Sequence, residues 1–405
     1  MTAPRQDLDA MLGPYAELYR AIQDRMRPGQ VLAADSPHQT MTGHFHHGTW
    51  TRERLAAHRR ILTDLRWANA DKPRDGRAIL LTAGPPGAGK TSALQLLDQL
   101  RQQHAPLAEE LTATHPRLAD FVIVDPDQFK RALLTDPTTR PELPDRALGL
   151  PGGHRLAPAE MANLVHAESR HLANQFALWA REHGHNLLYD TTLRTLNGHH
   201  ALLADLATRG YHHRTLLSVE TPLHTALTGN ATRWRDGRHA FDTGTNPYGG
   251  RMAPEHYIRA LYPNGPAERS TSRTNARRLA ADGAITGTIE IDRGNTGNTG
   301  DAEPRPGTST HRLADTTVHI TTGGSAHTTN PEVRPQRPVT LDVAQRLRQA
   351  RQLAITTGNG SGELDPTTDS PTPTSIPAGG HTRQPEVCNN PDGATLHRNS
   401  GTDAT

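Results

Sequence analysis

The feature that most constrains this chain is a glycine-rich loop between an apolar run and a helical pattern. Residues 78–94 read AILLTAGPPGAGKTSAL, which contains the spacing G-x-x-x-x-G-K-T. In such a loop the glycines let backbone N–H groups turn inward around a polyphosphate, while the lysine supplies a mobile positive charge. Lysine occurs only at positions 72, 90 and 130, so chance produces this pattern in roughly 0.3% of chains with this composition. The loop therefore predicts a phosphate-binding P-loop.

The residues around this loop define the expected nucleotide site. We expect Ala78–Thr82 to form a buried strand and residues 92–103 to form a helix, so that the phosphates lie at a helix N-terminus. Lys90 is expected to bind the phosphates, and Thr91 to offer its hydroxyl to Mg²⁺. The nucleotide-binding residues predicted in this way are Gly84, Pro85, Pro86, Gly87, Ala88, Gly89, Lys90, Thr91 and Ser92.

Apolar runs and helical patterns alternate after the loop. Strands are expected at residues 121–124, 186–189, 215–219 and 285–291, and helices at 159–183, 198–209 and 222–235. This alternation predicts a parallel sheet with helices on both faces, in which active sites lie at the carboxyl ends of the strands. Two helical patterns, within residues 8–22 and 51–69, precede the loop. The predicted fold class is therefore α/β, a P-loop kinase-like parallel sheet flanked by helices.

The composition divides the chain into regions. Hydrophobic residues make up 34% and aromatic residues 4%, with a mean hydropathy of −0.68, which is too polar for one compact body. From about Gly294 onward, glycine, threonine, proline and serine dominate, and such a segment cannot offset its ordering entropy. We expect an N-terminal helical extension at 1–74, a P-loop kinase domain at 75–293 and a largely disordered tail at 294–405 that catalysis does not need. Within the tail, residues 340–355 could form a short helix.

The charge balance and the length of the apolar segments limit the partners and the location expected for this chain. The 44 basic and 42 acidic residues are spread through the chain, so neither a nucleic acid nor a membrane surface is an expected partner. No apolar segment is long enough for a signal or a membrane span, and we expect a cytoplasmic protein. His44, His46 and His47 have a spacing that could ligate a metal, but with 24 histidines in the chain composition favours surface side chains.

Carboxylates follow two of the expected strands. The run VIVDPDQFK ends a strand with Asp125 and Asp127, and NLLYDTTLR ends the next with Asp190 and, two residues later, Thr192. A carboxylate at this edge of the sheet can accept a proton from an attacking hydroxyl or hold a metal through water. The alternative is that an aspartate here only caps the following helix. Because Asp127 follows the strand that is next in sequence after the P-loop, a functional role is favoured for it.

Five motifs in order resemble a known family. GPPGAGKTS, VIVDPDQFK, NLLYDTTLR, TGNATRW and GRMAPEHY together resemble the zeta toxins, the P-loop kinases of bacterial toxin–antitoxin systems. The resemblance covers roughly residues 75–292. It implies a kinase that uses ATP and Mg²⁺ to phosphorylate the 3′-hydroxyl of UDP-N-acetylglucosamine, which stops cell-wall precursor synthesis. It also implies a nucleotide-sugar substrate and an antitoxin protein as partners.

The resemblance also implies roles for single residues. Lys90 would bind the β- and γ-phosphates, and Asp127 would be the general base. Asp190, where the family usually has glutamate, and Thr192 would hold the sugar nucleotide. Arg233 and Arg251 stand where the family has two arginines that stabilise the transferring phosphoryl group, although Arg235 and Arg238 lie close enough to be alternatives to Arg233. A further acidic residue of the family's sugar site is expected on the helix before the third strand. By spacing it falls near Asn174, while Glu168 lies further up the same helix, and the sequence does not decide whether either contacts the substrate.

Other functions fit part of the pattern. A kinase for another small hydroxyl substrate, such as an antibiotic or a sugar, would keep every feature except the arginine pair and the segment around Thr192. A non-catalytic nucleotide-binding module would have no use for Asp127 together with Arg233 and Arg251. A GTPase would need an N-K-x-D motif, which the three lysines exclude.

Overall fold

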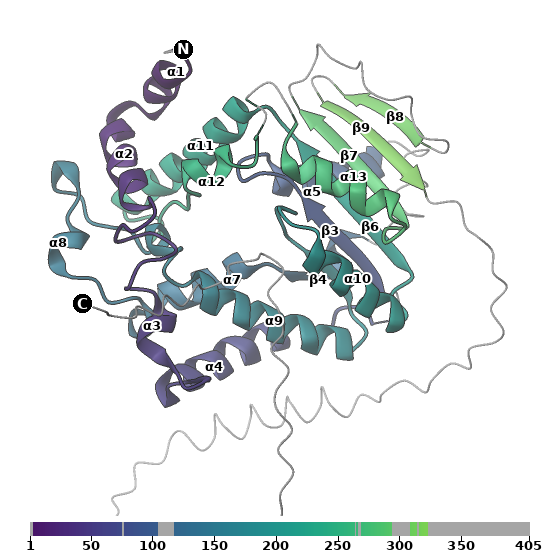
Figure 1. Cartoon of the computed structure of the whole chain (residues 1–405), viewed down its shortest axis with the longest axis horizontal. Coiled ribbons are helices and arrows are strands. Elements are labelled where there is room, and N and C mark those ends of the chain that lie inside the picture. Colours follow the sequence, from purple (N-terminus) through teal and green to yellow (C-terminus); the bar gives the residue numbers. More distant parts are fainter. Residues whose placement is uncertain are drawn as a thin grey trace, which may run out of the picture. The chain divides into compact units, whose positions relative to one another are not determined.

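A mixed sheet forms the centre of the computed structural model. The structure describes residues 3–74, 77–103, 117–263, 265, 269–293, 308–313 and 316–322. Its strands are β3 (Ala78–Ala83), β4 (Phe121–Val124), β5 (Asn186–Tyr189), β6 (His213–Glu220), β7 (Gly287–Arg293), β8 (Thr308–Leu313) and β9 (Thr316–Thr322). They lie in the order β4-β5-β3-β6-β7-β9-β8, with β4 to β7 parallel and the last two pairings antiparallel (Figure 1). The predicted fold class is confirmed, and β5 rather than β4 lies beside the P-loop strand β3.

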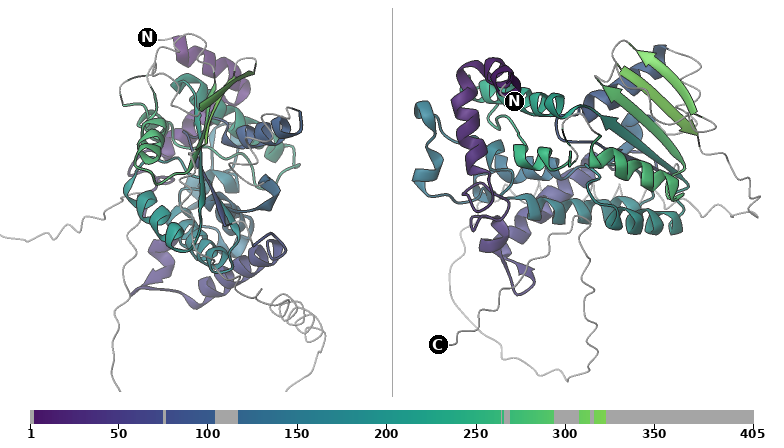
Figure 2. Two further views of the ribbon diagram at one scale, coloured as in Figure 1. Left: turned by 90° about the vertical axis from the view of Figure 1, so that its right-hand side faces the viewer. Right: turned by 45° about the horizontal axis from the view of Figure 1, so that its top comes forward.

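Side-chain alternation along the buried strands creates two apolar layers. On β3, Ile79 and Leu81 belong to one core cluster, and Leu80 to the other. The smaller cluster packs the sheet against α5 (Lys90–Gln103), through Ala93 and Leu97. The larger one packs the opposite face against α7 (Pro126–Thr135), α9 (His166–Glu182), α10 (Asn197–Thr208) and α13 (Thr271–Ala281). Helices therefore cover both faces (Figure 2), as a parallel sheet requires.

The N-terminal region packs against the kinase core at several points. Its helices are α1 (Ala3–Leu12), α2 (Ala16–Arg25), α3 (Thr40–His44) and α4 (Arg52–Ala68), with a short hairpin of β1 (Phe45–His46) and β2 (Thr49–Trp50). Helices α1 and α2 run beside α11 (Leu223–Asp242), as Figures 1 and 2 show. Helix α4 is held to α9 by Glu168, which is fully buried and accepts hydrogen bonds from Arg54 and His58 at 2.6 Å.

Several expected helices differ in their bounds. The pattern within 8–22 is interrupted at Gly13–Tyr15, because Gly13 has a φ of 54° and Pro14 lacks an N–H. The helix expected at 159–183 begins only at His166, after a 3₁₀ turn at Pro158–Met161. Within that turn Glu160 accepts hydrogen bonds from Trp234 and Arg238 of α11, a tertiary contact that the helical period does not reveal. Two short α-helices of the described residues are α8 (Asp145–Leu148) and α12 (Glu255–Arg259).

The sheet continues beyond the expected end of the kinase domain. Strands β8 and β9 lie within residues 308–322, a stretch that the sequence analysis assigned to the tail. Val318 and Ile320 of β9 are fully buried against Ile289 and Ile291 of β7, which the polar composition of the surrounding stretch conceals. The helix expected at 340–355 lies outside the described residues. Within the described ranges, no helix is long and apolar enough to span a bilayer.

Candidate active site

The P-loop is packed directly against α11. Gly87 has a φ of 85°, and a Cβ at this position would come within 2.0 Å of the Ala226 carbonyl oxygen. A Cβ on Gly229 of α11 would in turn lie 2.5 Å from the Gly87 oxygen. Only glycine allows this approach at both positions. The loop and α11 therefore form one rigid edge, which brings the helix that carries Arg233 next to the phosphate-binding loop.

Lys90 begins α5 and faces a carboxylate from the neighbouring strand. Its ammonium group donates to the Gly84 carbonyl at 3.1 Å and lies 3.8 Å from the Asp190 carboxylate. Asp190 follows β5, and the same oxygen accepts a hydrogen bond from the Thr82 hydroxyl of β3 at 2.7 Å. This contact exists because β5 pairs directly with β3. Asp190 is therefore beside the P-loop lysine, while Thr192 points to α12 and shares a hydrogen bond of 3.2 Å with the Tyr257 hydroxyl.

Asp127 lies in the first turn of α7 between two cations. Lys130, one turn later, is 3.0 Å from its Oδ1, and Arg251 pairs with its Oδ2. Burial by itself would raise the pKa of Asp127, but Lys130 and Arg251 outweigh burial and hold the pKa well below its ordinary value. Asp127 is thus ionised at neutral pH. Lys130 was not predicted as a site residue, although its i,i+3 spacing from Asp127 gives a signal for it.

Asp125 has a different environment from Asp127. Its side chain caps α7 by accepting a hydrogen bond from the Asp127 N–H at 2.8 Å. Burial raises the pKa of Asp125 to about 7, and the negative charges of Asp127 and Asp190 add to the shift. The two aspartates of this motif therefore differ. Asp125 caps the helix and has a pKa of about 7. Asp127 is ionised and lies between Lys130 and Arg251.

The structure separates the three candidate arginines of α11. Arg233 interacts electrostatically with Asp127, Asp190 and Asp125, and desolvation together with repulsion from Arg251 lowers its pKa to about 10. Arg235 instead donates to the Met11 carbonyl at 2.9 Å. Arg238 is buried and bridges Glu160 at 3.1 Å and Asp242 at 2.8 Å. Among these three arginines, Arg233 is therefore the one in the field of Asp127 and Asp190.

The two residues considered for a further acidic contact lie elsewhere. Glu168 is enclosed by Arg54, His58 and Thr40, so its carboxylate has no oxygen directed to the P-loop. Asn174 is exposed on α9. Metal ligation by the histidines near 44–47 finds no support either, because the described residues contain no group of three or more histidine, cysteine, aspartate and glutamate side chains that could hold a metal ion.

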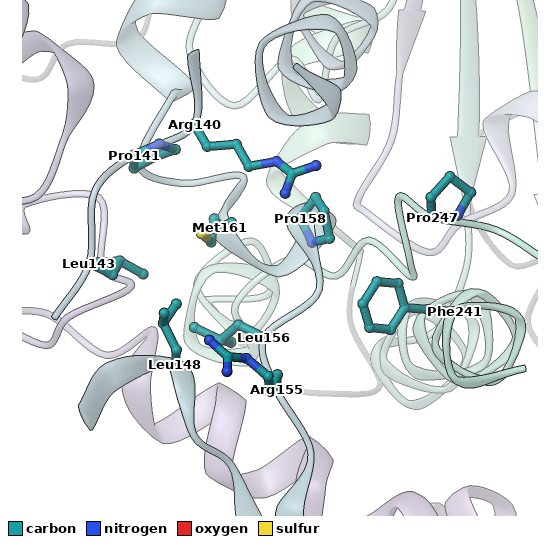
Figure 3. Close-up of a pocket in the computed structure, with 10 residues that line it drawn as sticks. All are labelled: Arg140, Pro141, Leu143, Leu148, Arg155, Leu156, Pro158, Met161, Phe241 and Pro247. Carbon is teal, nitrogen blue, oxygen red and sulfur yellow. The ribbon is translucent and has the colours of Figure 1, made fainter. Parts of the chain in front are cut away.

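Figure 3 shows a cavity of about 330 Å³ with the residues that line it. It is lined by Arg140, Pro141, Leu143, Leu148, Arg155, Leu156, Pro158, Met161, Phe241 and Pro247. None of the residues predicted for the site is among them. Of the residues predicted for the site, the P-loop, Asp127 and Asp190 lie at the carboxyl ends of β3, β4 and β5, and none of the predicted residues lines this cavity.

Comparisons with solved structures find several similar folds. One is from the PezAT chromosomal toxin–antitoxin system of Streptococcus pneumoniae, with 16% identity, coverage of 60% of this chain and 80% of that chain, and a TM-score of 0.39. The complex AvrRxo1-ORF1:AvrRxo1-ORF2 with sulphate ions has 19% identity and a TM-score of 0.35, and the match covers 71% of this chain and 70% of that chain. The same complex with ATP has 18% identity, the same coverage and a TM-score of 0.36. A search of curated proteins finds no match.

A comparison of the sequence with protein-family models identifies the family. The model of the zeta toxin family matches residues 64–286, which is more than half of the chain. The matched range contains the P-loop, the Asp127 motif, the Asp190 motif and both arginines. The chain therefore belongs to the zeta toxin family, whose members are ATP-dependent, kinase-like toxins of toxin–antitoxin systems.

Proposed function

We propose that this chain transfers the γ-phosphate of ATP to the 3′-hydroxyl of UDP-N-acetylglucosamine. The single observation that carries the proposal is the position of Asp127. This ionised carboxylate lies at the same edge of the sheet as the P-loop lysine, in contact with Arg251 and in the field of Arg233. A module that only binds nucleotide needs neither a proton acceptor nor a pair of arginines there. Family membership favours the nucleotide sugar as the acceptor.

On the donor side, residues 84–92 would hold the triphosphate. Fit to this group is supported by the Gly87 backbone, where any side chain would meet α11, and by Lys90 at the start of α5. The Thr91 hydroxyl suits Mg²⁺, which prefers oxygen ligands and, when bound, neutralises charge on the phosphates. Asp190 beside Lys90 would lie where donor and acceptor meet, and with Thr192 we assign it to the sugar nucleotide.

On the acceptor side, the residues divide the chemical work. The acceptor oxygen attacks the γ-phosphorus, the bond from phosphorus to the β,γ-bridging oxygen breaks, and ADP leaves. The proton of the hydroxyl passes to the Asp127 carboxylate. Arg233 and Arg251 would stabilise the negative charge that spreads over the transferring group, since a planar guanidinium can contact two phosphate oxygens. Arg251 would then exchange its contact with Asp127 for a contact with phosphate.

The test is direct phosphorylation. Purified protein is incubated with ATP, Mg²⁺ and UDP-N-acetylglucosamine, and the nucleotide sugar is weighed by mass spectrometry. We expect the mass of one added phosphate, formed much more slowly by the Asp127→Asn variant than by the parent. If the nucleotide sugar gains no phosphate while another small alcohol does, the nucleotide sugar is not the acceptor. The second candidate function, a kinase for a different hydroxyl substrate, would then be favoured. Tight ATP binding with no transfer to any acceptor would favour the non-catalytic module.

The proposal also includes a protein partner, an antitoxin. Because the family consists of toxins of toxin–antitoxin systems, we propose that a protein antitoxin restrains this chain. Its expected effect is measurable in the same reaction, since adding the antitoxin at equimolar concentration should suppress phosphate transfer. An antitoxin that leaves transfer unchanged would contradict this part of the proposal.

A further inference from the structure

A glutamine of the N-terminal region contacts the segment that carries Arg251. The Gln23 side chain, on α2, donates to the Ala253 carbonyl at 3.2 Å, and its oxygen accepts a hydrogen bond from the Glu255 N–H at 2.8 Å. The same amide nitrogen lies 3.0 Å from the Met252 sulfur. These contacts join residues more than two hundred positions apart, and Gln23 lies outside the range matched by the family model.

Asn230 holds the same segment from the other side. It is fully buried on α11, accepts from the Ala253 N–H at 2.8 Å and donates to the Ala253 carbonyl at 3.0 Å. Its oxygen also accepts from the Arg233 guanidinium at 3.3 Å. Asn230 therefore connects the two arginines, and Gln23 adds the hydrogen bonds that Asn230 cannot make, to residues just after Arg251.

The segment needs such support because it has no regular structure. Residues 249–254 lie in neither a helix nor a strand, so no ladder of backbone hydrogen bonds fixes them. Gly249 and Gly250 precede Arg251, and the Gly250 backbone packs so closely on α11 that a Cβ there would lie 2.0 Å from the Trp234 carbonyl oxygen. Fixing the backbone of such a segment costs about 1–2 kcal/mol of conformational free energy per residue. The Gln23 and Asn230 side chains supply hydrogen bonds to residues 253–255 that help to offset this cost.

Helix α2 is a firm platform for the clamp. Leu18, Tyr19 and Ile22 are buried, and the Tyr19 ring lies 5.2 Å from the ring of Trp234 on α11. Helix α2 is therefore packed against α11, which also carries Arg233 and Asn230. A side chain on α2 can for this reason fix a catalytic segment, and not merely touch it.

We propose that Gln23 is a positioning residue for phosphoryl transfer, which holds Arg251 at the reacting phosphate through residues 252–255. The proposal rests on the role proposed above for Arg251. It means that helix α2, which lies outside the matched family range, supports the active site. Gln23 itself touches neither substrate, so its effect should pass entirely through Arg251.

The experiment compares Gln23→Met with the parent, because methionine has a similar length and lacks both hydrogen bonds. We expect kcat to fall about tenfold, since small misplacements of catalytic groups cost up to a hundredfold, with the Kd for ATP unchanged. In an Arg251→Ala background, Gln23→Met should have no further effect on kcat. Gln30→Met, an exposed glutamine of the same region, is the matched control and should retain parental kcat.

A second measurement is independent of any reaction. Backbone amide exchange in residues 252–256 should become faster in Gln23→Met, because the Glu255 N–H loses its acceptor, while exchange in β3 should stay unchanged. Unaltered exchange in 252–256 would overturn the inference. So would an active parent with a normal Gln23→Met kcat, or effects of Gln23→Met and Arg251→Ala that multiply independently. A parent that transfers no phosphate, with faster exchange in the variant, would instead count against the proposed function alone.

Discussion

The two sides of the site are built in different ways. On the donor side, β3, the P-loop and the first turn of α5 follow each other in residues 78–92, and Asp190, which follows β5, lies at the border of this side beside Lys90. On the acceptor side, Asp127 comes from α7, Arg233 from α11 and Arg251 from an irregular segment clamped by α2 and α11. Phosphate binding is therefore a local property of the sequence, whereas transfer chemistry depends on contacts across the whole fold.

The largest expected effect separates the two sides. Asp127→Asn keeps the size of the side chain and loses the proton acceptor, so phosphate transfer should fall by roughly 10²-fold to 10⁴-fold, with ATP affinity preserved. ATP affinity by calorimetry and transfer by mass spectrometry test both parts. Asp125→Asn, two residues away, is the matched control and should cost less. Equal transfer by Asp127→Asn and the parent would refute the assignment of the base.

The complementary change is on the donor side. Lys90→Ala removes the cation that lies between the P-loop and Asp190, and turnover of ATP should fall by roughly 10²-fold or more. Unlike Asp127→Asn, this variant should also bind ATP more weakly. If Lys90→Ala kept near-normal turnover, the P-loop would not be the donor site, and the division into two sides would fail.

Asp190 lies at the border between the two sides. Asp190→Asn retains an oxygen that can accept from Thr82 but removes the charge beside Lys90. We expect a loss of transfer of roughly tenfold to 10²-fold, as a higher KM for the acceptor at saturating Mg²⁺. A steeper dependence on Mg²⁺ with an unchanged acceptor KM would move Asp190 to the donor side instead.

A smaller effect concerns stability and pH. The folded-state pKa of Asp125 is about 7, above its ordinary value of 3.8, so the native state binds more protons than the unfolded state between these values. Stability contributed by this carboxyl is therefore lost as pH rises from about 4 to 7. Asp125→Asn should raise the free energy of unfolding by about 1 kcal/mol or more at pH 8 and leave it nearly unchanged at pH 4. Denaturant melts at both pH values test this, and a gain confined to pH 4 would contradict it.

The smallest effect tests the tail. Truncation after Thr322 retains β9 and should leave transfer by both sides of the site within about twofold of the parent. Truncation after Gly294 removes β8 and β9, which exposes the edge of β7 that pairs with β9 and removes the buried side chains of Val318 and Ile320. Each such side chain contributes about 1.5–3 kcal/mol on burial, so the shorter chain should unfold at a lower temperature. Equal thermal stability of the two truncations would show that β9 contributes nothing to the fold.

The sequence alone determined the fold class and the family, and both are confirmed. The reason is that a P-loop is a local structure, in which strand, glycines, lysine and helix start are consecutive, and that alternating strands and helices permit few topologies. The strands at 121–124 and 186–189 have the predicted bounds because their apolar runs are short and continuous. Asp127, Arg233 and Arg251 could be named from motifs, and their roles stay predictions.

Only the tertiary structure decided which residues meet. The insertion of β5 between β3 and β4 places Asp190, and not the sequence-adjacent Asp125 motif, beside Lys90. The orientation of α11 in the fold directs Arg233 and Arg235 to different neighbours, and Arg238 to a third set. The sequence shows only that the three arginines are close together in the chain. The contacts of Gln23 with residues 252–255 span most of the chain. Local patterns encode the period of a helix or strand, but pairing order and side-chain clamps arise from packing between distant segments, which no single stretch of sequence contains.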